Sequence, residues 1–197
     1  PPPPPPPPPP PFFFNPHPVT RDPLWSRGLG DVYKRQVSAS SAAIYFQDPV
    51  RAASQGTIRV AAAGETLIGS LNGIFFTDAN TSKPTFANHL LGSNTATDIV
   101  AFVADDPYER FEIQSDNTLA SAQTDVFMNY DILYTAGDSA NYVSKVELDD
   151  STVSTTSGQL KVMGVTTNID NNDLTASNVN FVVTINEHFY KAAVAGK

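Results

Sequence analysis

Alternation of apolar and polar residues is the feature that most limits what this chain can fold into. It is clearest in NVNFVVTINEHF, residues 178–189. A β-strand turns successive side chains to opposite faces of its sheet, so this pattern predicts a half-buried strand. The predicted inner face holds Val179, Phe181, Val183 and Ile185, and the outer face holds Asn178, Asn180, Thr184 and Asn186.

Short apolar runs separated by frequent turns predict an all-β fold, a single compact β-barrel or sandwich with long polar loops. Turn sequences such as AAGE, GSNT and ADDP lie between the runs, and Gly, Asn, Asp and Pro favour turns. The segment 118–134 is long enough for a helix, but its β-branched and aromatic second half favours a strand, so both stay open. The other predicted strands are 43–46, 57–63, 66–76, 98–104, 110–114, 144–149 and 159–165, the last with a bulge or close backbone approach at Gly164.

The region that carries these patterns, 37–197, has a normal length for one domain with its own core. A polar stretch at 114–122 separates two groups of predicted strands and marks a possible subdivision. We expect the second group to close the first in one all-β structural domain. The polar run 149–159 predicts an exposed loop or hairpin tip.

Residues 1–36 differ in kind from the rest. They begin with eleven prolines and end in SRGLGDVYKRQ, residues 26–36, whose codons resemble the adapter of transposase-based sequencing libraries. An alternative is a natural polyproline II arm that binds aromatic grooves. We favour the adapter because these consecutive residues and their flanks all fit it. The adapter interpretation predicts a disordered, artefactual extension that makes no packed contact with the fold. It places the first interpretable residue at Val37 and implies that the natural residues before it are missing.

The acidic charge limits the possible partners. The chain has 12 Lys and Arg against 20 Asp and Glu; residues 1–36 hold four of the former and two of the latter, which leaves eight against eighteen and a net charge of about −10. A nucleic-acid partner needs a basic face, which eight scattered cations can hardly build. No apolar run approaches the roughly 20 residues of a membrane-spanning helix. We expect neither nucleic acid nor membrane as a partner, and the absence of cysteine excludes disulfides and thiolate metal sites.

Few residues suggest catalysis. His17 lies in the adapter-like segment, and His89 and His188 remain. His188 falls on the last predicted strand, where a structural histidine is expected, and His89 lies beside a loop without an identifiable carboxylate partner. The sequence leaves open a Ser-His-Asp arrangement built from distant segments, but no G-x-S-x-G, Walker or dinucleotide-binding motif occurs. We expect a protein that is not an enzyme, without catalytic residues or cofactor.

Two acidic runs could carry other chemistry. IDNND offers oxygen ligands for a hard cation, but it lacks the glycine and terminal glutamate of an EF-hand loop, and a solvated turn is favoured. ADDP offers a carboxylate pair for acid/base work, but the proline that follows favours a turn instead. We therefore expect no metal site. The residues concerned are Asp170, Asn171, Asn172 and Asp173 in the first run, and Asp105, Asp106 and Pro107 in the second.

A distributed set of motifs covers nearly all of 37–197. It comprises an aromatic strand ending in DPV, an AAGE turn before IG, the strand GIFFTD, the segment KPTF, the run DIVAFVADDP and INEH near the end. Together these motifs resemble a group of tailed-phage virion structural proteins, common in marine phages and generally encoded near the major capsid gene. Members of that group carry further residues ahead of the segment AIYF, where this chain has the adapter-like sequence.

The resemblance implies a capsid-associated protein that decorates or stabilises the phage head. Its partner would be the lattice of the major capsid protein, its location the virion surface after synthesis in the host cytoplasm, and its state a homo-oligomer. Modest contacts repeated around a closed shell add up to a large stabilisation. A tail or head-fibre component is the alternative within the structural class. A carbohydrate-binding or hydrolytic β-domain is the alternative outside it, for which exposed aromatic platforms are expected, but the only Trp, Trp25, lies in the adapter-like segment.

Overall fold

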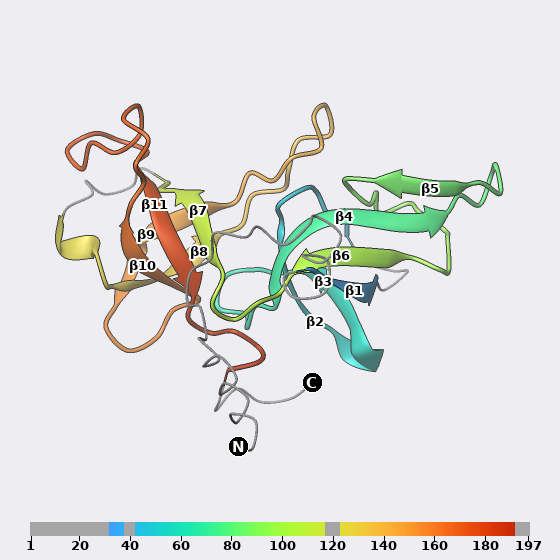
Figure 1. Ribbon diagram of the computed structural model, residues 1–197, viewed down its shortest axis with the longest axis horizontal. Coiled ribbons are helices and arrows are strands. Elements are labelled where there is room, and N and C mark those ends of the chain that lie inside the picture. The colour runs from blue at the N-terminus through green and yellow to red at the C-terminus, as the bar shows by residue number, and fades with distance from the viewer. Residues whose placement is uncertain (1–31, 38–41, 117–122, 192–197) are drawn as a thin grey trace, which may run out of the picture.

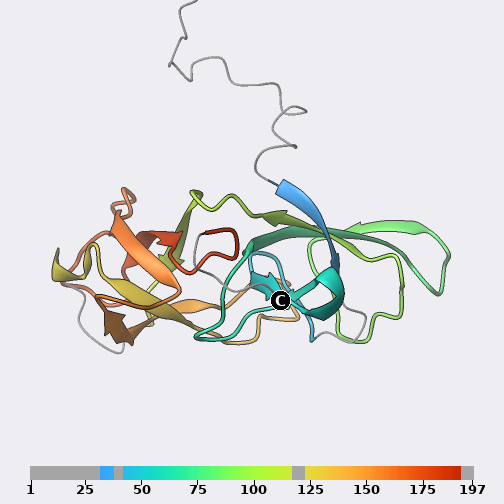
Figure 2. The same ribbon diagram turned by 90° about the horizontal axis from the view of Figure 1, so that it is seen from below.

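The computed structural model describes residues 32–37, 42–116 and 123–191. These residues form two β-sheets and no α-helix, so the all-β prediction is confirmed (Figure 1). The sheets do not close into a barrel, and a sandwich describes them better. The two sheets lie side by side along the long axis of the molecule, as Figures 1 and 2 both show.

The first sheet has six strands in the spatial order β2-β3-β1-β6-β4-β5. Its pairs are antiparallel except for β1 with β3. A second, short pairing of β2 with β4 curls the sheet back on itself. The hairpin of β4 and β5 extends away from the second sheet (Figure 1). The strands are β1 (Val32–Val37), β2 (Pro49–Ala52), β3 (Thr57–Val60), β4 (Gly69–Thr77), β5 (Pro84–Ala87) and β6 (Val100–Ala104).

The second sheet has five antiparallel strands in the order β7-β11-β10-β8-β9. Its two outer strands, β7 and β9, meet through one isolated parallel bridge, Ser115 with Leu148. A register shift between Val162 and Gly164 gives β10 the bulge that the glycine predicted. The strands are β7 (Arg110–Gln114), β8 (Asn129–Leu133), β9 (Glu147–Ser154), β10 (Leu160–Val165) and β11 (Asn180–Ile185).

Each sheet has its own apolar core. In the second core the predicted inner face of β11 is buried, with Phe181 at its centre. The cores are not independent, because Leu67 from the first half of the chain packs into the second core, and Phe189 from the end packs against the first. The chain crosses from one sheet to the other between Ala104 and Arg110, ahead of the possible boundary at 114–122. Residues 117–122 lie outside the described residues, and the division into domains stays a prediction.

Several strand boundaries differ from those predicted. The segment 43–46 forms only isolated bridges, because Ile44 pairs with Leu90 while Phe46 pairs with Val143, in a different part of the chain. Much of the run 149–159 is strand rather than loop, since β9 continues to Ser154. In the open segment 118–134, the second half forms β8, as its β-branched and aromatic residues favoured.

Two strands, β2 and β5, were not predicted because each begins with a proline. Proline lacks the N–H that a sheet ladder uses, so it argues against a strand in a sequence pattern. At the first residue of a strand that missing donor is tolerated. In β5, Pro84 pairs with Thr77 at the end of the β4–β5 hairpin.

The expectation that residues 1–36 stay outside the fold is wrong for 32–36. These residues form most of β1, which pairs with β6 from Val32 to Gln36 and with β3 at Gln36 and Val37. The physical reason is that a sheet ladder joins backbone groups, which every residue except proline supplies in full, so the slot between β3 and β6 accepts an extended segment of many sequences. This pairing counts against the adapter interpretation, which predicts that residues 1–36 make no packed contact with the fold. Residues 1–31, which hold the proline run, lie outside the described residues.

Candidate functional site

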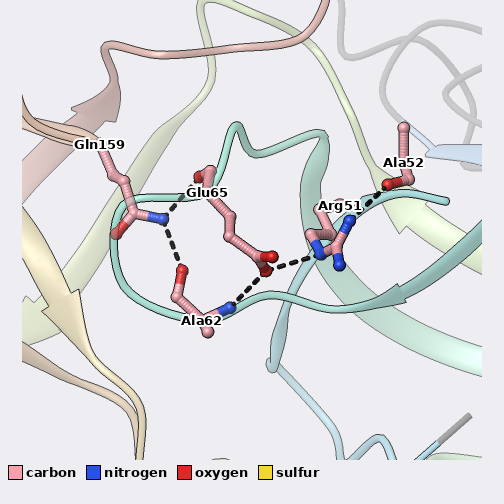
Figure 3. Close-up of polar contacts among 5 residues, drawn as sticks. All are labelled: Arg51, Ala52, Ala62, Glu65 and Gln159. Atoms are coloured by element: carbon pink, nitrogen blue, oxygen red, sulfur yellow. Dashed lines mark hydrogen bonds and ion pairs between the residues drawn. The ribbon is translucent and has the colours of Figure 1, made fainter. Parts of the chain in front are cut away.

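The two sheets are joined by the side chain of Gln159, which precedes β10 and is fully buried. Its amide nitrogen donates hydrogen bonds to the backbone oxygens of Ala62, at 3.0 Å, and Glu65, at 2.6 Å, in the AAGE turn of the first sheet. Its amide oxygen accepts from the backbone N–H of Ile132 in β8 at 3.1 Å. One side chain thus satisfies backbone groups from both halves of the molecule. Figure 3 shows its two hydrogen bonds to the turn of the first sheet.

The same turn holds an ion pair. Arg51 Nε in β2 lies 2.6 Å from Glu65 Oε2, and the side chain of Arg51 is only 9% exposed. The carboxylate also accepts the backbone N–H of Ala62 at 2.9 Å, while the guanidinium donates to the backbone oxygen of Ala52 at 3.1 Å (Figure 3). A buried cation needs such partners, because its charge is costly to remove from water. Arg51, Glu65 and Gln159 therefore form the polar junction, the name used below for this group.

A second connection lies at the INEH segment after β11. The backbone N–H of Leu67 donates to the oxygen of Glu187 at 3.0 Å, and that of Phe189 donates to the oxygen of Leu67 at 2.8 Å. His188 between them is fully buried, and its Nδ1 accepts the backbone N–H of Tyr190 at 3.1 Å. Burial lowers the pKa of His188. His188 is buried in the connection between the sheets, but it follows β11, which ends at Ile185, and makes an isolated bridge with Leu67 instead of lying on the last strand as predicted.

A cleft of about 410 Å³ opens between the sheets beside β7. All residues of β7 line it, from Arg110 to Gln114. Neighbouring residues of a strand face opposite sides of the sheet, so a lining by consecutive residues means that the cleft follows the backbone edge of β7. Ser144 and Val146, just before β9, form the opposite wall, and Leu67 contributes from the first sheet.

An exposed aromatic face covers the outer side of the β4–β5 hairpin. Phe86 in β5 is 67% exposed and Phe75 in β4 is 39% exposed, and the two are direct register partners, which places them on the same face. The Phe86 ring also lies 5.6 Å, between centroids, from that of Phe102 in β6. A Cβ at Gly73 would come within 2.8 Å of the Phe86 ring, so this glycine leaves room for it. We call Phe75, Phe86 and Phe102 the aromatic face.

His89 lies at a different place from His188. Its ring stacks on Tyr142 with a centroid distance of 3.7 Å and an interplanar angle of 3°. Its Nδ1 is hydrogen-bonded to Asn88 Oδ1 at 2.8 Å. Partial burial lowers the pKa of His89, which keeps the ring neutral near pH 7. The two histidines are thus in separate environments, one on an aromatic stack and one between the sheets.

The ADDP carboxylates have different roles. Asp106 Oδ1 accepts the backbone N–H of Tyr108 at 2.8 Å, and its own backbone oxygen accepts the N–H of Glu109 at 3.1 Å, as expected of a turn. Asp105 is buried instead, and its Oδ2 accepts from the Tyr190 hydroxyl at 3.3 Å. The turn prediction is confirmed for Asp106, and Asp105 belongs to the packing around the INEH segment.

The IDNND run forms a turn between β10 and β11. Asp173 Oδ1 accepts from the backbone N–H of Thr175 at 2.9 Å and from its hydroxyl at 2.7 Å. These bonds lower the pKa of Asp173. Asp170 donates its backbone N–H to Asn168 Oδ1 at 3.2 Å. Across the described ranges, no three His, Asp or Glu side chains come together in a way that could hold a metal ion.

No sequence pattern predicts the polar junction, the cleft or the aromatic face. Gln159 occurs in a polar run where nothing marks a buried amide. The sequence does contain one sign of the aromatic face. GIFF places apolar residues on both faces of β4, whereas a strand with one solvated face would alternate apolar and polar residues. The cleft forms where β7 and the segment before β9 diverge. Because these segments are distant in sequence, no local pattern indicates it.

Comparisons with known proteins found no relative of this chain. None of the helices in the described part of the chain has the length and apolar character that crossing a membrane requires. No family model, no curated protein and no solved structure matches the chain.

Proposed function

We propose that the chain is a non-enzymatic structural protein of a tailed-phage virion, which decorates or stabilises the capsid through protein–protein contacts. The aromatic face is the observation that carries the proposal. Contiguous exposed apolar side chains are unfavourable in water, and on soluble proteins such patches mark surfaces that bind other proteins. Phe86 is the most exposed member of the aromatic face, and aromatic side chains are frequent anchors of interfaces.

Three further properties support a structural role. The motif resemblance points to capsid-associated proteins. The fold is all-β, and the polar junction joins its two sheets through buried hydrogen bonds without any disulfide. The net charge of −8 suits a surface that faces solvent and disfavours one that faces packaged DNA.

The experiment is co-sedimentation of the purified protein with assembled capsids of the source phage. The wild-type protein is expected to pellet with the capsids, and the Phe75→Ser, Phe86→Ser double variant to bind at least tenfold more weakly. Phe127→Ser is the matched control, because Phe127 is 71% exposed but lies apart from the aromatic face, just before β8. The control should bind as the wild type does.

Two outcomes would contradict the proposal. If the wild-type protein stays in the supernatant with capsids and with whole virions, the chain has no virion partner. If the double variant binds as well as the wild type, the aromatic face is not the contact surface. Binding to isolated tails and not to heads would instead favour a tail component.

A further inference from the structure

One edge of β7 carries backbone groups that point into the cleft. The backbone N–H of Ser115 donates to the oxygen of Val179 at 2.9 Å, next to the register pair of Gln114 with Asn180. Bonded and non-bonded pairs alternate in an antiparallel ladder, so odd-numbered residues of β7 bond to β11. The N–H and C=O groups of Arg110, Glu112 and Gln114 therefore point the other way. Over the described residues of this edge, β9 approaches only at the end of β7, through the bridge of Ser115 with Leu148 and the hydrogen bond from the Asp116 N–H to the Leu148 oxygen, and no strand pairs with Arg110 or Glu112 from this side.

The cleft lies where a further strand could fit between β7 and the segment before β9. β7 and the segment leading into β9 run in the same direction and touch at the bridge of Ser115 with Leu148. The cleft lies between them ahead of this bridge, from Arg110 on one wall to Ser144 on the other. A strand that ran opposite to β7 here would be antiparallel to both walls. A residue in a sheet occupies roughly 160 Å³, so a cleft of about 410 Å³ has room for two to three residues, and the ends of a longer segment would extend beyond it.

We propose that this cleft binds an extended segment of another protein chain, which pairs antiparallel with the free edge of β7. Binding by strand addition draws its affinity from main-chain hydrogen bonds and its specificity from alternate side chains. The proposal does not depend on a role in the virion. It names a partner class, an exposed strand or arm of a protein, and excludes small ligands that have no peptide backbone.

The side chains of β7 define what the segment should contain. Phe111 and Ile113 are half-buried against the second core, so apolar residues should stand opposite them. Arg110 and Glu112 are exposed on the other face, and Asn180 Nδ2 holds the carboxylate of Glu112 at 2.9 Å. Opposite charges on directly opposed residues stabilise a sheet. The segment should therefore place an acidic residue opposite Arg110 and a basic residue opposite Glu112.

The test uses a synthetic peptide of the sequence STVKLES, blocked at both ends and labelled with fluorescein. In antiparallel register its Val and Leu face Ile113 and Phe111, its Lys faces Glu112 and its Glu faces Arg110. Fluorescence anisotropy with the full chain should show saturable binding below 1 mM. N-methylation of the Lys removes a hydrogen bond to β7 and should weaken binding at least tenfold. N-methylation of the C-terminal Ser, which lies beyond Arg110 and outside the cleft, should change it less than threefold.

A charge swap checks the register. Arg110→Glu should weaken binding of STVKLES at least fivefold, because it places two acidic residues opposite each other. The peptide STVKLKS, with Lys in place of that Glu, should restore binding. Arg110 is exposed, so its replacement should leave the fold intact. The Phe75→Ser, Phe86→Ser variant should bind STVKLES as the wild type does, so failure of the proposed function is distinguishable from failure here. The proposal is overturned if no peptide binds at 1 mM, if the two N-methylated peptides behave alike, or if the charge swap restores nothing.

Discussion

The side-chain amide of Gln159, next to the second sheet, donates a hydrogen bond of 2.6 Å to the backbone oxygen of Glu65, in a turn of the first sheet. The contact spans 94 residues of sequence. It belongs to the polar junction, in which the fully buried Gln159 side chain is bonded to backbone groups of both halves. The contact joins the two sheets together with the backbone hydrogen bonds of the INEH segment to Leu67.

Replacing Gln159 by Ala should destabilise the protein by about 3 kcal/mol. The change removes the Gln159 partner of the Glu65 oxygen and of the Ile132 N–H, and it leaves the Ala62 oxygen with only the Glu65 N–H at 3.3 Å. A buried backbone group that loses its hydrogen bond costs about 1–3 kcal/mol, partly relieved where water enters. Urea unfolding, followed by circular dichroism, gives the change in free energy. Gln123→Ala is the control, because Gln123 is exposed and its replacement should cost under about 0.5 kcal/mol. Equal midpoints for the two variants would show that Gln159 does not hold the sheets together.

Arg51 and Glu65 should show an energetic coupling of about 1 kcal/mol in a double-mutant cycle. Arg51→Met keeps much of the apolar length, and Glu65→Gln keeps an acceptor for the Ala62 N–H. Their ion pair is largely shielded on the arginine side, with side-chain exposures of 9% and 34%, so the coupling should exceed that of most surface pairs and survive 1 M NaCl in part. Thermal unfolding of the wild type, both single variants and the double variant measures it. Additive effects would mean that the pair contributes no coupling.

Much of the fold follows from local patterns, and β11 shows why. Its alternation appears directly in the sequence, and the inner residues Val179, Phe181, Val183 and Ile185 are all buried. The bulge at Gly164 is also local, because glycine tolerates the irregular backbone that a bulge requires. Such features depend on residues that are close in sequence.

Features that depend on distant partners could not be predicted. Ile44 and Phe46 look like strand residues, but their partners lie in two different segments, so they make isolated bridges. The buried state of Gln159 depends on a turn 94 residues away. The codons of residues 32–36 suggest an artefact, whereas the ladder that holds them in β1 joins backbone groups. In each case the deciding contact is long-range.

Asp48→Asn should stabilise the protein at neutral pH. Asp48 is fully buried, and this burial raises its pKa, against the smaller effects of hydrogen bonds from Ser144 and the Tyr45 N–H. A carboxyl group with a raised pKa in the folded state opposes folding once it is ionised. Its unfavourable contribution is complete above the folded pKa and vanishes below the unfolded value. The Asp48→Asn side chain carries no charge and keeps an acceptor for the Tyr45 N–H.

The measurement is the difference in Tm between wild type and Asp48→Asn, taken at pH 7 and again at pH 4. The difference should be positive at pH 7 and shrink as the pH falls. Asp98→Asn is the control of opposite sign, because hydrogen bonds from Thr77 lower the pKa of Asp98. The stabilising contribution of Asp98 is present above the unfolded pKa and is lost as the pH falls through the folded pKa. The Asp98→Asn substitution should therefore lower Tm at pH 7. The same sign for both variants would contradict this account of Asp48.

Variants of strand β1 can separate the contribution of its backbone pairing from that of its side chains. Deleting residues 1–36 removes its pairing with β6 and β3, and at about 0.5–1.5 kcal/mol per net hydrogen bond this should cost about 4 kcal/mol. Deleting 1–31 alone is the matched control and should leave the stability of the fold unchanged. Replacing 32–36 by TVTVT in the full chain should keep stability within about 1 kcal/mol, because the slot requires an extended backbone and not these side chains. Urea unfolding of the four proteins measures all three effects. If the two deletions have equal stability, residues 32–36 do not contribute to the fold, as the adapter interpretation predicts.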